Sequence, residues 1–223
     1  MTKFGVVFLL LVAMTTAVGI ARPLHPEPQA PTAPGVAANQ RLTALAGALL
    51  VILTAAIAVT ILFIQPLLPE HYVVGFVFIP PLALKLASTA YRFARYYAGQ
   101  PAYRLAGPPP ALLRFVIAPV LVLSVLAVFA TGLELWLFGL RFGTAWMTAH
   151  TLSAAVFVPV AGLHLVARAR PSTAAALAEF RASRHREAIS GRALVIGSLL
   201  LGASLAAASL LYATPFPPAA AGG

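Results

Sequence analysis

The sequence predicts an all-α fold, a polytopic membrane helical bundle with five core transmembrane helices and a further hydrophobic helix at the N-terminus. Of the 223 residues, 61% are hydrophobic and only 9% are charged. The mean hydropathy is +0.92. Several apolar runs approach the roughly 20 residues that an α-helix needs to cross the hydrocarbon core. Soluble domains do not have this composition.

The chain divides into four parts by composition. Residues 1–22 form a hydrophobic segment, either a transmembrane helix or a signal peptide, and residues 23–38 are a linker rich in proline and alanine. Residues 39–213 are the predicted bundle, and residues 214–223 are expected to be a disordered tail. Within the bundle we expect spans at about 42–64, 71–91, 113–139, 144–168 and 193–213.

Basic residues divide unequally between alternate loops. The net charge is +10, and the lysines and arginines fall mainly before the second span, between the third and fourth, and between the fifth and sixth. The positive-inside rule makes these loops cytoplasmic. This orientation needs a retained first span with its N-terminus outside, since a cleaved signal would invert every loop. The segment 171–192 is expected to be a short amphipathic helix or loop at the cytoplasmic surface, in contact with lipid. The charge therefore predicts orientation, and we expect no nucleic-acid partner.

The sequence contains no cysteine. Disulfides, thiolate-bound iron–sulfur clusters and haem attached covalently through cysteine are therefore excluded.

Two histidines stand inside the fifth apolar span, and ionisable residues there are costly and often functional. His150 and His164 are fourteen residues apart, which places both on one helix face, roughly 21 Å apart along the axis. The third span repeats this frame. His71 to Lys85 aligns without a gap with His150 to His164, and five of the fifteen positions are identical, including Pro80 with Pro159. We therefore predict a duplicated helix pair.

Four residues of this repeat are candidate metal ligands. His71 and His150 would face each other near the outer leaflet, with Lys85 and His164 near the inner one. Two imidazoles without a carboxylate cluster suit an iron macrocycle better than zinc, which wants four tetrahedral ligands. The alternatives are histidines in a polar groove and a lysine whose stem reaches the cytoplasmic interface.

The same residues resemble a family. The helix with histidines fourteen residues apart is similar to the haem-bearing helices of b-type cytochromes in quinol-oxidising complexes. The run from Arg41 through residues 78–114 to His164 resembles an actinobacterial group of cytochrome b-like integral membrane proteins. This resemblance covers about residues 39–213. It implies haem b, one or two per chain, and electron transfer beside a redox partner subunit in a bacterial plasma membrane. Lys85 stands where such cytochromes have a fourth histidine.

The predicted function is therefore a b-type cytochrome that passes electrons through haem held between the third and fifth spans. It would be an electron-transfer subunit of an oxidoreductase, not an independent catalyst. Arg92 and Arg95 are candidates to pair with haem propionates. Glu134 is a candidate proton acceptor if a quinone site exists; otherwise it would reach the interface or interact with Arg141. The alternatives are a cofactor-free membrane anchor or assembly subunit and, third, a transporter.

The charge distribution generates a test of orientation. Because the chain has no cysteine, single cysteines can be introduced at Gly99 and Ser183, in the two loops richest in arginine. If these loops are cytoplasmic, both cysteines should resist a membrane-impermeant thiol reagent in intact cells. Ready labelling of both would show that the topology is inverted.

Overall fold

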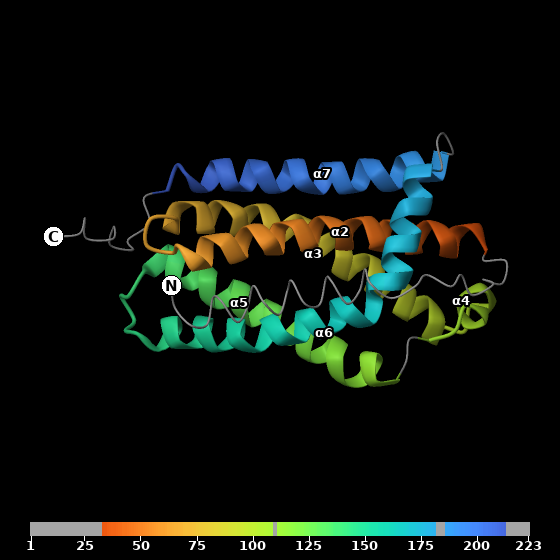
Figure 1. Ribbon diagram of the computed structural model, residues 1–223, viewed down its shortest axis with the longest axis horizontal. Coiled ribbons are helices and arrows are strands. Elements are labelled where there is room, and N and C mark those ends of the chain that lie inside the picture. Colours follow the sequence, from red (N-terminus) through yellow and green to blue (C-terminus); the bar gives the residue numbers. More distant parts are fainter. Residues whose placement is uncertain (1–32, 109–110, 182–185, 213–223) are drawn as a thin grey trace.

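The computed structural model describes residues 33–108, 111–181 and 186–212, and throughout these ranges the chain is helical, with no β-strand (Figure 1). In chain order the elements are α2 (Pro34–Leu62), α3 (Leu68–Tyr97), α4 (Pro101–Leu105), the π-helix η1 (Leu113–Ile117), α5 (Ala118–Phe138), α6 (Ala145–Arg181) and α7 (Arg186–Ser209). The predicted N-terminal hydrophobic segment, residues 1–22, and the predicted tail, residues 214–223, lie outside the described residues.

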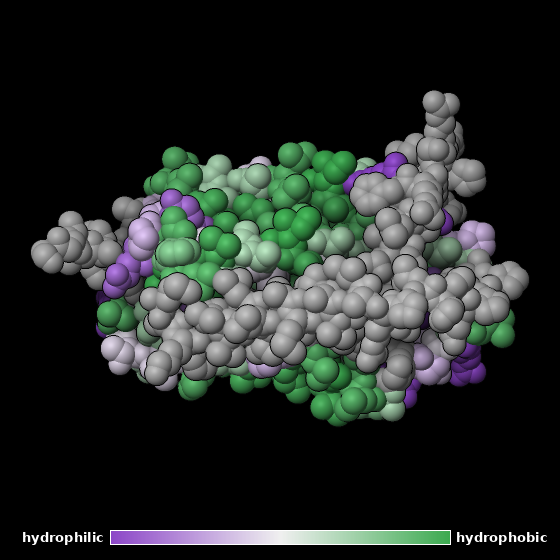
Figure 2. Space-filling model, in the orientation of Figure 1, coloured by the Kyte–Doolittle hydropathy of each residue, from purple (hydrophilic) through white to green (hydrophobic). Residues whose placement is uncertain are grey.

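Five of the described helices are long and apolar enough to cross a membrane, which confirms the predicted fold class. They are Pro34–Leu62, Leu68–Tyr97, Leu113–Phe138, Ala145–Leu165 and Ser190–Ser209. Large apolar side chains such as Ile52 and Leu123 face outward. Many buried positions hold small residues, among them Ala46 and Ser124. Small residues let membrane helices approach closely, and lipid covers the rest. Figure 2 shows a largely hydrophobic surface along the helices, with hydrophilic residues toward the two ends.

Two helix boundaries differ from the predicted ones. α2 begins at Pro34, so residues 34–38, predicted as linker, belong to the helix. Proline at the first helical position has the required φ and needs no N–H there, so it starts a helix well. α6 continues to Arg181, where a break near residue 168 was predicted. The alanine-rich stretch 174–178 favours helix and supports this continuation. The last part of α6 turns across the bundle toward α7 (Figure 1).

The helices pack as two antiparallel pairs with a fifth helix alongside. α2 packs on α3, α5 packs on α6, and α7 packs on α3, while α2 also touches α6 and α7. The α2–α3 and α5–α6 turns lie at one end of the bundle, and α4 lies at the other end (Figure 1). We call these the turn end and the α4 end. The predicted duplicated helix pair corresponds to α2 with α3 and α5 with α6.

The contact between α3 and α7 depends on Pro81 and Gly202. Pro81 has no N–H, so the carbonyl of Val77, four residues earlier, loses its usual helical partner. α7 approaches α3 closely at this point. A Cβ atom built on Gly202 would collide with the Val77 carbonyl group and lie 3.0 Å from the Val77 Cα. Glycine is required here because the neighbouring atoms are backbone, which cannot swing aside.

We expect Gly202→Ala to push α7 away from α3 and to destabilise the bundle by about 1–3 kcal/mol, the usual cost of overpacking. The measurement is the apparent melting temperature of the detergent-purified protein. Gly197→Ala, on the same helix, is the matched control, because a Cβ there meets nothing within 4 Å. Equal melting temperatures for the two variants would contradict the close approach.

Candidate functional site

His71 and His150 meet across the bundle near the turn end. His71 lies in the first turn of α3, and His150 lies in the second turn of α6. Their ring centroids are 6.4 Å apart, and the ring planes are nearly perpendicular, at 87°. Both side chains are half-buried. The prediction that these two imidazoles face one another at one depth is confirmed, whereas their role as ligands remains a prediction.

A threonine on the preceding helix holds each imidazole. In the first pair, Thr60 of α2 lies 2.9 Å from Nδ1 of His71 and donates its own hydroxyl to the carbonyl of Ile57 at 2.7 Å. A hydroxyl has one proton, so Thr60 accepts from the imidazole and Nδ1 carries the hydrogen. The lone pair of His71 therefore resides on Nε2, the nitrogen left for another partner.

The second pair repeats this arrangement. Nδ1 of His150 lies 3.1 Å from the hydroxyl of Thr131 and 3.1 Å from the carbonyl of Val128, both on α5. Thr131 donates to the carbonyl of Ala127 at 2.6 Å. Because a carbonyl only accepts, Nδ1 of His150 must be the donor. Both histidines thus have the same tautomer, with Nε2 as an acceptor or ligand.

These threonines were missed in the sequence, although they form part of the duplication. Thr60 precedes His71 by eleven residues, and Thr131 precedes His150 by nineteen. The two turns between the helices differ in length, so an ungapped comparison of the histidine helices cannot align the threonines. Comparing each preceding helix separately would have found them.

A close helix contact brings His150 to α5. A Cβ atom built on Gly132 would lie 3.0 Å from Cε1 of His150 and 3.4 Å from its Nδ1. On the side of the rings toward the α4 end, Phe78 of α3 packs against Phe129 of α5, with ring centroids 5.5 Å apart. The imidazole pair thus lies between a glycine contact and an aromatic layer.

Lys85 and His164 occupy the inner positions of the repeat, and both are half-buried. The Lys85 ammonium donates a hydrogen bond to the carbonyl of Thr43 on α2 at 2.6 Å. It also lies against Gly47, where a Cβ would come within 2.9 Å of Nζ. Lys85 therefore ties α3 to α2 inside the first helix pair, a role that the sequence did not predict. His164 lies on α6, fourteen residues beyond His150.

Arg92 and Arg95 lie in the last turns of α3, toward the α4 end. Twenty-one residues separate His71 from Arg92, which corresponds to roughly 32 Å along the helix. These arginines are therefore far from a group bound between His71 and His150. A propionate contact is compatible only with a second haem at the level of Lys85 and His164.

Glu134 departs from what the sequence suggested. Both of its carboxyl oxygens are buried and have no hydrogen-bond partner among the described residues. It therefore does not reach the interface. Arg141, proposed as its partner, instead lies over the ring of Phe142, 5.8 Å from the centroid.

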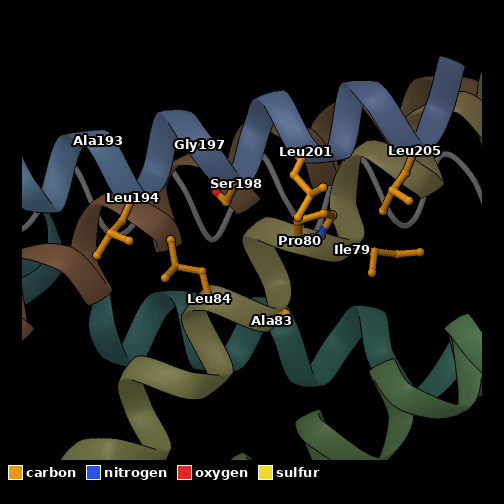
Figure 3. Close-up of a pocket in the computed structure, with 10 residues that line it drawn as sticks. All are labelled: Ile79, Pro80, Ala83, Leu84, Ala193, Leu194, Gly197, Ser198, Leu201 and Leu205. Carbon is orange, nitrogen blue, oxygen red and sulfur yellow. The ribbon is translucent and has the colours of Figure 1, made fainter.

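A separate groove runs between α3 and α7, with a volume of about 490 Å³. Leu194 and Leu201 of α7 point toward Pro80 and Leu84 of α3 (Figure 3). Its lining is almost wholly apolar, with Ser198 as the polar exception. The groove contains neither histidine and offers no ligand for a metal.

The imidazole pair is thus the described feature with the clearest chemistry. Within residues 33–108, 111–181 and 186–212, no three histidine, cysteine or carboxylate side chains gather as a metal site. The pair alone cannot supply the four protein ligands of a tetrahedral zinc site, but two axial imidazoles suffice for a haem. No protein-family model, curated protein or solved structure matches the chain.

Proposed function

We propose that the protein is a membrane b-type cytochrome that binds haem b between α3 and α6, with His71 and His150 as axial ligands. The observation that supports this most directly is the pair of imidazole rings with centroids 6.4 Å apart. Metal–imidazole bonds of about 2 Å on each side of an iron place the ring centroids roughly 6 Å apart. The separation in the bundle therefore suits one iron between the two rings.

The hydrogen bonds on Nδ1 also fit a ligand pair. A histidine that binds a metal usually donates its other ring N–H to a carbonyl or a polar side chain, which fixes the tautomer and orients the ring. Thr60 does this for His71, and Thr131 with Val128 does it for His150. Each Nε2 then presents its lone pair.

Each part of the chain has a definite role in this proposal. The bound haem would supply a one-electron redox centre. His71 and His150 would hold it, the threonines would orient the imidazoles, and the surrounding apolar helices would provide a low dielectric. The site lies within one or two turns of the α2–α3 and α5–α6 connections, close to water. A redox partner subunit or a quinone could exchange electrons there in a bacterial plasma membrane.

We propose one haem per chain. Lys85 has the hydrogen-bonding role of a donor to Thr43, and a ligand would instead have to direct a nitrogen lone pair at iron. Lys85 and His164 therefore support a second haem less well than His71 and His150 support the first.

The alternative function, a cofactor-free membrane anchor, also has a specific observation in its favour. Both threonine–histidine bonds join the two helices of one pair, so they stabilise the pairs without a cofactor. Under this alternative the histidines serve assembly alone. Haem content separates the two functions.

The proposal predicts that the purified, dithionite-reduced protein has the Soret and α bands of haem b. His71→Ala or His150→Ala should abolish these bands, since each removes one axial ligand. Haem quantification should give about one per chain, and His164→Ala and Lys85→Met should leave the spectrum unchanged.

Two outcomes would count against this proposal. If protein expressed with ample haem shows no Soret band, the anchor function replaces it. A stoichiometry near two, with bands sensitive to His164→Ala, would instead establish an inner haem.

A second prediction concerns the threonines. Thr60→Val should weaken haem retention by about tenfold or more, the usual effect of losing an orienting partner of a metal-bound histidine. Thr131→Val should have a smaller effect, because Val128 still accepts from His150. Haem loss to apomyoglobin measures both. Thr54→Val is the matched control, because the Thr54 hydroxyl bonds only the carbonyl of Leu50. If all three variants lose haem at the rate of the unmodified protein, the threonines do not orient ligands.

A further inference from the structure

Three arginines gather at the α4 end of the bundle, far from the histidines. Arg92 and Arg95 are in the last turns of α3, and Arg104 is in α4. We call these three residues the arginine cluster. The sequence contains no acidic residue between Glu70 and Glu134. Glu70 lies in the first turn of α3, at the opposite end of that helix.

Aromatic residues join the cluster into one surface. Arg95 donates from Nε to the hydroxyl of Tyr91 at 2.9 Å, and its guanidinium carbon lies 5.0 Å from the centre of that ring. The rings of Tyr91 and Tyr103 are 6.1 Å apart, which brings α3 and α4 together. Arg104 lies beside the turn at Gly99, where a Cβ would be 3.8 Å from its guanidinium carbon.

The phenol of Tyr103 does not neutralise these cations. Burial, followed by the neighbouring Tyr91, raises the pKa of Tyr103 above its usual value of 10.0. Tyr103 therefore stays neutral at physiological pH. Among the described side chains, the cluster thus presents three guanidinium groups beside neutral phenols and no carboxylate.

Exposed apolar side chains lie next to the same arginines. Leu105, which follows Arg104, is 88% exposed, and Phe93 is 54% exposed. A free phosphate ion would gain nothing from such neighbours, whereas a lipid has both an anionic headgroup and apolar chains. Guanidinium groups bind phosphate oxygens through paired hydrogen bonds, and interfacial aromatic residues lie at the level of the headgroups.

We propose that the arginine cluster, together with Tyr91 and Tyr103, is a binding surface for the phosphate headgroup of anionic membrane lipids. The neighbouring apolar residues would contact the acyl chains. This surface is independent of the haem site, because roughly 32 Å of helix separates Arg92 from His71. In the predicted orientation it faces the cytoplasmic leaflet, where anionic lipids attract basic residues.

The test measures binding of phosphatidylglycerol and phosphatidylcholine to the full chain in neutral detergent, by native mass spectrometry. Phosphatidylglycerol should bind more tightly. Each arginine removed should weaken its binding about fivefold, so Arg95→Gln combined with Arg104→Gln should weaken it about 25-fold. Arg141→Gln is the matched control, because Arg141 is an exposed arginine in the α5–α6 turn, at the other end of the bundle. The control should bind as the unmodified protein does.

Further arms make every result decisive. Equal binding of the two lipids, or a double variant that binds as well as the unmodified protein, would overturn the proposal. Glycerol phosphate that competes as effectively as the lipid would show a simple phosphate site and would overturn the lipid assignment. If the double variant does not fold, the unmodified protein decides, because its preference for phosphatidylglycerol should disappear at about 1 M salt. A preference that persists there would contradict the proposed charge pairing.

Discussion

Hydrocarbon offers no hydrogen-bond partner, and this constraint shapes every polar contact inside the bundle. Buried threonines and serines donate back to carbonyls of their own helices, as Thr60 does to Ile57 and Ser124 does to Leu121. Such bonds leave a hydroxyl oxygen free to accept. Where that oxygen meets an imidazole, it fixes the proton on Nδ1 and leaves Nε2 available. The tautomer of both central histidines thus follows from the absence of water.

The same constraint explains the close helix contacts. Pro81 frees the carbonyl of Val77, and α7 lies against this point through Gly202. Gly47 and Gly132 give the side chains of Lys85 and His150 room to reach neighbouring helices. In each case a missing side chain lets a polar group approach another helix, and the large apolar residues remain outside against lipid.

The sequence predicted the features that depend on periodicity and composition. Five apolar runs became five helices, and the shared frame of His71 and His150 predicted that the two rings meet. Contacts set by three-dimensional packing were not predictable in this way. Lys85 was assigned either to a metal or to the interface, yet it bonds the carbonyl of Thr43, because α2 passes within reach of its amine. The burial of Glu134 likewise depends on side chains from elsewhere in the chain.

α3 links the two ends of the bundle in one continuous helix. Its first turn holds His71, and its last turns hold Arg92 and Arg95. Between them Lys85 bonds to α2 and Val77 meets α7, so both neighbours fix the rotation and depth of α3. Since His71 needs the correct depth to face His150, the contacts along α3 determine the geometry of the imidazole pair. Lipid bound at the arginine cluster would hold the same helix from its other end.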